Sequence, residues 1–164
     1  MSVCKSAALV AIGLVLAGCA AFSPVRPGMT RAQVVSRMGQ PTAAVPLPNG
    51  DERLQYSGQP AGQTAYMVDL DASGHVVRDS QVLTAESFAR IQPGWSRADV
   101  LREFGRPARI DHVGSWHGDI WTYRWRDADM TDMYYWVYFD RDGKVARTQQ
   151  GMEFLNAPDN VNKN

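Results

Sequence analysis

The sequence predicts an α+β fold of two tandem units, each a helix followed by a three-stranded antiparallel sheet. Three observations favour this fold. A long stretch of the chain occurs twice, each copy opens with helix start and stop signals, and each continues with alternating apolar and polar segments. Self-similarity at a fixed offset is typical of duplicated structural units, and alternation of period two is typical of half-buried strands.

The duplication is visible over most of the chain. Residues 25–41 match residues 91–107 at a constant offset of 66, with seven identical positions. Further along, residues 66–71 match residues 135–140, where the offset has grown to 69. The second copy therefore has three additional residues in its loops.

Each copy carries the signals of one short helix. Thr30 and Ser96 are the predicted N-caps, because each has a Gln or Asp three residues later that completes a capping box. Gly39 and Gly105, each followed two residues later by Pro, are the predicted helix ends. A further short helix is expected over residues 84–91.

Strands are expected where period-two alternation follows each helix. The turns Asp-Ala-Ser-Gly at residues 71–74 and Asp-Arg-Asp-Gly at residues 140–143 separate strand pairs, with Gly supplying a positive φ. We expect strands around residues 53–57, 64–71, 75–83, 120–126, 132–140 and 144–150.

The N-terminus has the pattern of a secretory signal peptide. One Lys precedes a short apolar run, which ends in Leu-Ala-Gly-Cys at residues 16–19. This ending resembles the lipobox of bacterial lipoproteins, which implies that the chain is cut before Cys19 and that Cys19 is acylated. Ala20 after the Cys resembles the signal for export to the outer membrane. The predicted organisation is a signal peptide (1–18), a lipid anchor and tether (19–26), a first repeat (27–83), a second repeat (84–154) and a disordered tail (155–164).

Composition excludes few functions. Lys plus Arg and Asp plus Glu are equal at 17 each, a balance that gives no indication of nucleic-acid binding. No catalytic triad order, nucleophile elbow or phosphate loop is recognisable, so we expect a non-enzymatic protein without cofactor.

The repeated motif resembles a known family. Pro-Gly-Met-Thr-x-x-x-Val-x-x-x-x-Gly-x-Pro from Pro27, followed by an aliphatic strand and Asp-x-x-Gly, is similar to the SmpA/OmlA (BamE-like) outer-membrane lipoproteins. The resemblance implies a scaffold or accessory role in outer-membrane protein assembly or envelope integrity, with a partner among the barrel-assembly subunits. Two tandem copies also resemble the β-lactamase inhibitor proteins, which bind enzymes across their sheets. The alternative function is therefore a periplasmic enzyme inhibitor or binding module.

Alternation assigns the two faces of each sheet. In the first copy Asp69 is expected in water, which places Val68 and Leu70 on the core face. The corresponding core residues of the second copy are Tyr135, Val137 and Phe139. The outward residues that we predict to bind a protein partner are Arg124, Arg126, Tyr134, Trp136 and Tyr138.

Two alternatives stay open at this point. Trp, Tyr and Arg are enriched at binding hot spots, but the same aromatic face would also suit a seam between the two copies. In addition, Asp111, His112, His117 and Asp119 crowd one segment with ligand types that suit zinc. Gly and Trp residues between them favour a loop tip, and we predict no metal site.

Overall fold

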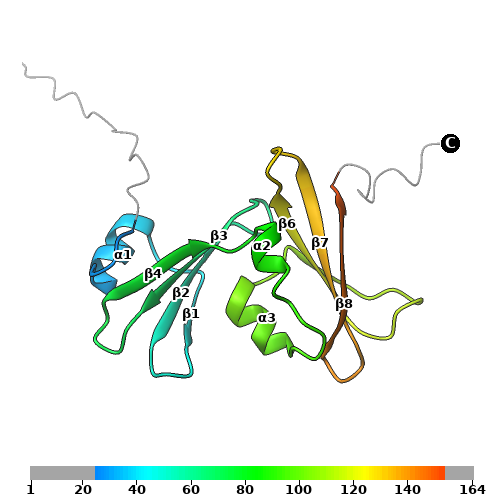
Figure 1. The fold of residues 1–164 in the computed structure, drawn as a ribbon, viewed down its shortest axis with the longest axis horizontal. Helices are drawn as coiled ribbons and strands as arrows, with labels where there is room; N and C mark the ends of the chain where they lie inside the picture. Colours follow the sequence, from blue (N-terminus) through cyan, green and yellow to red (C-terminus); the bar gives the residue numbers. More distant parts are fainter. Residues whose placement is uncertain (1–24, 154–164) are drawn as a thin grey trace, which may run out of the picture.

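The computed structural model describes residues 25–153, which form two four-stranded antiparallel sheets in the orders β1-β2-β3-β4 and β5-β6-β7-β8. The predicted α+β fold of two tandem units is confirmed (Figure 1). The signal peptide, Cys19 and the tail at 155–164 lie outside the described residues. The elements are α1 (Arg31–Met38), β1 (Ala43–Pro46), β2 (Glu52–Ser57), β3 (Ala65–Leu70), β4 (Val76–Gln81), α2 (Ala85–Phe88), α3 (Arg97–Phe104), β5 (Arg109–Asp111), β6 (Ile120–Arg126), β7 (Asp132–Phe139) and β8 (Val145–Met152).

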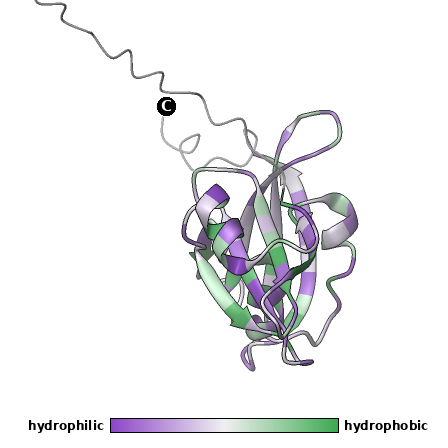
Figure 2. Cartoon of the chain, turned by 90° about the vertical axis from the view of Figure 1, so that its left-hand side faces the viewer, coloured by the Kyte–Doolittle hydropathy of each residue, from purple (hydrophilic) through white to green (hydrophobic). Residues whose placement is uncertain are grey.

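Each sheet has one strand more than expected. The additional strands, β1 and β5, are short edge strands that pair with β2 and β6. The short helix expected over residues 84–91 is confirmed in its first part, since α2 has four residues. Hydrophobic (green) and hydrophilic (purple) residues are mixed within the strands (Figure 2).

The helix signals of the two copies give the same local structure. Thr30 and Ser96 cap α1 and α3, and both capping boxes are formed. Both helices end at a Gly with positive φ, 81° at Gly39 and 72° at Gly105. These capping motifs satisfy the backbone N–H groups that a helix N-terminus leaves without partners.

Each unit has its own hydrophobic core between its sheet and its helices. The first core is small and aliphatic, built on Val34, Leu54, Val68, Leu70 and Val76. The second is larger and aromatic, with Phe88 stacked between Tyr135 (ring centroids 4.0 Å apart) and Phe104 (5.2 Å). The core faces predicted for β3 and β7 are therefore confirmed.

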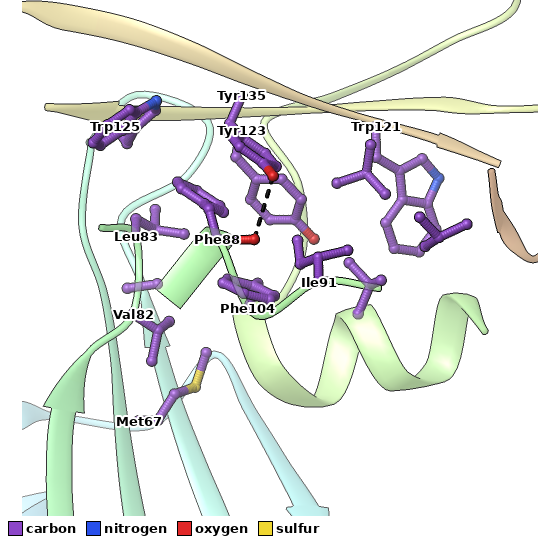
Figure 3. Close-up of a cluster of buried hydrophobic side chains, with 14 of the residues drawn as sticks. Met67, Val82, Leu83, Phe88, Ile91, Phe104, Trp121, Tyr123, Trp125 and Tyr135 are labelled. Carbon is purple, nitrogen blue, oxygen red and sulfur yellow. Dashed lines mark hydrogen bonds between the residues drawn. The ribbon is translucent and has the colours of Figure 1, made fainter. Parts of the chain in front are cut away.

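The second core also receives side chains from the first unit, because α2 and α3 lie between the two sheets (Figure 1). Ala65, Met67, Val82 and Leu83 belong to the same buried cluster as the aromatic residues of the second unit. Figure 3 shows Met67 of β3 below Phe88 and Phe104. The apolar part of the seam is thus continuous with the hydrophobic core of the second unit.

Asp69 was expected in water, and this prediction is wrong. Its side chain is 6% exposed and lies at the seam, where the Arg53 guanidinium contacts both of its oxygens at 2.6 and 3.0 Å. Arg78 binds Asp69 from the other side at 2.6 Å. Alternation correctly places Asp69 opposite the core of its own unit, but that face is covered by the second unit.

Candidate protein-binding face

Each sheet has an inner face, which packs on the helix of its own unit, and an outer face on the opposite side. The outer face of the first sheet contacts α3 of the second unit, and this contact is the seam between the units. Gln55 donates from Nε2 to the carbonyl oxygens of Leu101 (2.9 Å) and Arg102 (3.2 Å), at the C-terminal end of α3. Arg53 donates to the Arg102 carbonyl at 3.1 Å and forms an ion pair with Glu103 at 3.0 Å.

The ion pairs of the seam hold their charges in the folded protein. Burial opposes ionisation of Asp69, but hydrogen bonds from Arg53 and Arg78 outweigh it and hold the pKa of Asp69 below its ordinary value. Burial likewise lowers the pKa of Arg53, and its bonds to Asp69 and Glu103 reverse that effect and raise it. A buried ion pair of this kind is costly to break from one side.

In contrast to the first sheet, whose outer face contacts α3, the second sheet has no helix packed on its outer face among the described residues. Tyr134, Trp136 and Tyr138 follow one another along its central strand β7, and all three are partly exposed. The intervening Tyr135 and Val137 are buried at 8% and 0% exposure. The predicted aromatic residues therefore lie side by side, with the Tyr134 and Trp136 rings 5.8 Å apart.

The register of β6 and β7 brings two predicted arginines onto the same face. Arg124 lies opposite Tyr134, and Arg126 lies opposite Asp132. Arg126 binds Asp132 at 2.9 Å through side chains that are 43% and 47% exposed. Its guanidinium therefore remains accessible at the rim of the face.

Arg124 is already engaged within the chain. Its Nη1 donates to the carbonyl oxygens of Pro60 (3.1 Å) and Ala61 (2.7 Å), and its Nη2 pairs with Glu153 at 2.7 Å. The bond to Glu153, opposed by burial, raises the pKa of Arg124. This residue holds a loop of the first unit against the second sheet and has little capacity left for a partner.

Gln59 completes that junction and was not singled out from the sequence. Its amide donates to the Arg124 carbonyl at 2.6 Å and accepts from the Arg124 N–H at 3.2 Å, so it pairs with β6 as a neighbouring strand would. Gln59 is 2% exposed, and its own carbonyl accepts from Arg106 at 2.6 Å. No local signal predicts a contact between residues 65 positions apart.

Arg147 and Trp116 extend the face beyond the predicted residues. The Arg147 guanidinium lies 3.5 Å from the ring centroid of Tyr138 and 5.3 Å from that of Trp116. Trp116 is fixed by a hydrogen bond from its indole N–H to the Phe139 carbonyl at 2.7 Å. Arg147 matches Arg78 of the first copy, so the internal repeat was the signal that could have identified it.

The loop that carries Trp116 contains the residues considered as metal ligands. Asp119 pairs with Arg97 at 2.7 Å, and His112 lies 3.3 Å from its other oxygen with a side chain that is 74% exposed. Within residues 25–153, no group of three or more His, Cys, Asp or Glu side chains has the arrangement needed to hold a metal ion. Arg97 therefore occupies the position that a cation would take beside Asp119.

Comparisons with known proteins find distant structural similarity only. No family model matches the sequence, and no curated protein matches it. A DUF4309 family protein (YjgB) from Bacillus subtilis is 14% identical with a TM-score of 0.32, covering 76% of this chain and 78% of that chain.

Two further solved structures are similar to the same degree. An extracellular protein containing a SCP domain from Bacillus anthracis is 14% identical, with a TM-score of 0.33 and coverage of 92% of this chain and 50% of that chain. A cysteine-rich secretory protein from Staphylococcus aureus is also 14% identical, with a TM-score of 0.29 and coverage of 77% and 44%. The chain thus spans about half the length or less of these two proteins. None of the helices between residues 25 and 153 has the length and apolarity to span a bilayer.

Proposed function

We propose that this chain is a lipid-anchored protein of the bacterial envelope that acts by binding another protein through the outer face of its second sheet. The observation that carries the proposal is the contrast between the two outer faces. The first is buried in the seam, whereas the second leaves Tyr134, Trp136 and Tyr138 partly exposed in one row. Rows of aromatic side chains rimmed by arginine are typical of binding hot spots.

The envelope location rests on the N-terminal sequence. The Leu-Ala-Gly-Cys ending at Cys19 supports lipidation, and the Pro-Gly-Met-Thr motif from Pro27 supports a relation to the SmpA/OmlA lipoproteins. Two acyl chains anchor a protein stably where a single chain does not. We therefore place the protein at the outer membrane, facing the periplasm, in a scaffold or accessory role.

Lipidation is tested by Cys19→Ala with metabolic palmitate labelling and membrane fractionation. The wild-type chain should carry label and sediment with outer membranes, whereas the variant should carry none and should accumulate as precursor or soluble chain. Label retained on the variant would contradict the lipid anchor.

The binding face is tested by crosslinking intact envelopes and purifying the tagged chain. Trp136→Ala should lose the captured partner, whereas Val77→Ala, which truncates a side chain 50% exposed on the first sheet, should retain it. Capture of barrel-assembly subunits would support the scaffold role, and capture of a periplasmic hydrolase would support the alternative role as an enzyme inhibitor. Equal capture by both variants would exclude this face.

A further inference from the structure

The second sheet ends at β8, an edge strand of eight residues (Figure 1). At the end of this strand the N–H of Glu153 donates toward β7, to the Asp132 carbonyl at 2.9 Å. Because the backbone groups of successive residues in a strand point to opposite edges, those of Thr148 and Gln150 point away from β7. No other strand pairs with them among residues 25–153. β8 therefore presents backbone donors and acceptors to a further strand.

The three other sheet edges carry features that discourage pairing with a further strand. β1 and β5 have only four and three residues, and β1 ends in Pro46. β4 has the charged side chains of Arg78 and Asp79 in its middle. From Thr148 to Met152, β8 has no charged residue, proline or bulge. Among the edges within the described residues, β8 is therefore the one best suited to take another strand.

The beginning of the β8 edge is already paired within the chain. The N–H of Gly94 donates to the Val145 carbonyl at 2.8 Å, and the N–H of Val145 donates to the Trp95 carbonyl at 2.8 Å. The chain then enters α3 at Arg97 and leaves this edge. The segment before α3 thus covers only the first part of β8, up to the irregularity in register that precedes Arg147.

A groove lies beside the uncovered part of β8, on the inner face of the sheet. It encloses about 340 Å³ between α2 and β8 and is lined by Ala85, Ala89, Tyr135, Thr148, Gln149 and Gln150. The methyl groups of the two alanines and the tyrosine ring give it apolar surface. An added strand would direct alternate side chains to this inner face. The groove therefore suits an apolar side chain of such a strand.

The remaining side chains of an added strand would lie on the outer face, beside Arg147. This exposed residue stacks its guanidinium on the Tyr138 ring at 3.5 Å and donates to Gln149 Oε1 at 3.1 Å. No Asp or Glu side chain between residues 25 and 153 forms an ion pair with it. A guanidinium that stacks on a ring can still bind a carboxylate in its own plane. An acidic side chain is therefore the favoured neighbour on the outer face.

We infer that β8 binds an extended segment of another protein as an additional antiparallel strand, with apolar side chains over the groove and acidic side chains beside Arg147. The backbone groups of Thr148 and Gln150 supply the hydrogen bonds, and the two rows of side chains supply the selectivity. This edge is a second contact, distinct from the outer face around Trp136, so the inference goes beyond the proposed function and does not depend on it.

The test uses a fluorescently labelled eight-residue peptide of alternating valine and glutamate, titrated with the full chain in detergent and followed by fluorescence anisotropy. With valine over the groove, the valine N–H groups face β8 and the glutamate N–H groups face away. N-methylation of the valines should therefore weaken binding at least about tenfold, whereas N-methylation of the glutamates should leave the affinity unchanged. Replacing glutamate by lysine should weaken binding about threefold or more, because lysine repels Arg147.

A matched pair of proline variants tests the edge from the side of the protein. Thr148→Pro removes an N–H that points away from β7, a position at which an edge strand tolerates proline. Asp79→Pro makes the same change at the corresponding position of β4. Thr148→Pro should weaken peptide binding about tenfold, and Asp79→Pro should bind as the wild type does. Circular dichroism checks the folding of both variants, and the N-methylated peptides decide the question if Thr148→Pro does not fold.

Three results would overturn the inference. Equal affinity of the two N-methylated peptides would show that the backbone of β8 is not used. Slow hydrogen exchange at the Thr148 and Gln150 amides without peptide, independent of protein concentration, would show that the chain itself fills this edge. Exchange that slows as the protein concentration rises would identify a second copy as the occupant. Fast exchange that slows only when the valine-glutamate peptide is added is the result that the inference predicts.

Discussion

The two outer faces differ at corresponding backbone positions. Ala65, Met67 and Asp69 of β3 correspond to Tyr134, Trp136 and Tyr138 of β7. The first set is buried, at 0%, 2% and 5% exposure, whereas the second is partly exposed. The face that receives a helix has small, flexible or paired side chains, and the face without one has large aromatic side chains.

This difference follows from the position of the seam in the tandem. The seam occupies the outer face of the first unit and leaves that of the second unit without a neighbouring helix among residues 25–153. Met67 fits irregular gaps because its side chain is unbranched and flexible. Aromatic side chains instead provide large and rigid surfaces that suit contact with another protein.

The largest expected loss of stability comes from truncating a residue on the inner face of β7. Tyr135→Ala should lower the free energy of unfolding by about 3–5 kcal/mol, because it removes a buried ring stacked on Phe88. The substitution also removes the hydroxyl that donates to the Phe88 carbonyl at 3.3 Å. Urea unfolding of the purified chain measures the change. A loss below about 1 kcal/mol would mean that the inner and outer faces of β7 have been inverted.

Asp69→Ala should lower the free energy of unfolding by a similar amount. Comparing it with Tyr138→Ala compares the same position in the two units. Removing the Asp69 carboxylate leaves the Arg53 guanidinium, 5% exposed, with its main partner missing, which should cost about 3–5 kcal/mol. Tyr138→Ala at the corresponding position should cost less than about 1.5 kcal/mol, since no buried charge loses its partner. Similar losses for both variants, again from urea unfolding, would contradict the assignment of the seam to the first outer face.

Much of this organisation could be predicted from the sequence because it depends on local signals. The caps at Thr30 and Ser96, the Gly ends of the helices and the alternation of β7 each involve neighbours a few residues apart. The strands β1 and β5 were missed because three or four residues are too few to show alternation, and β1 ends in a proline.

The contacts between the units could not be predicted in the same way. Asp69 is an outward residue of its own sheet, and only the packing of α3 against that sheet makes it buried. The same holds for Gln59 and Arg124, which meet across 65 residues of sequence. The placement of Tyr134, Trp136 and Tyr138 could be predicted because it follows from alternation alone, whereas their exposure depends on where the seam lies.

A smaller difference in stability is expected between substitutions at the ends of α1 and α3. Gly105→Ala and Gly39→Ala should each cost about 1–3 kcal/mol, because a φ near +75° with an extended ψ is a conformation restricted to glycine. Gly105→Ala should cost slightly more, since its Cβ lies 3.4 Å from Gln55 Oε1 in the seam. Thermal unfolding of the two variants compares them. A greater loss for Gly39→Ala would argue against close packing at Gly105.

The smallest expected effect is a difference in acid sensitivity between two ion pairs. The folded pKa of Asp69 lies below its ordinary value, so its contribution to stability is complete above about pH 4 and is lost as the pH falls through the folded pKa. The stability difference between wild type and Asp69→Asn should therefore shrink as the pH falls from about 5 to about 2.

Asp132 provides the matched control for that titration. It pairs with Arg126 on the second outer face with a side chain 47% exposed, and solvent screens such pairs strongly. Asp132→Asn should therefore change the pH dependence of unfolding much less than Asp69→Asn. Equal slopes for the two variants would indicate that the seam pair is as accessible to water as the surface pair.

The most direct test of the account compares Met67→Ala with Trp136→Ala, because the two residues occupy the same position in the two units. Both chains are unfolded in urea at the same pH and salt concentration. Met67→Ala should lower the free energy of unfolding by about 2–5 kcal/mol, since it opens a cavity in the seam. Trp136→Ala, which removes the larger side chain, should lower it by no more than about 1 kcal/mol. A larger loss for Trp136→Ala would show that the aromatic face is covered within the molecule, and would contradict its assignment as the free binding face.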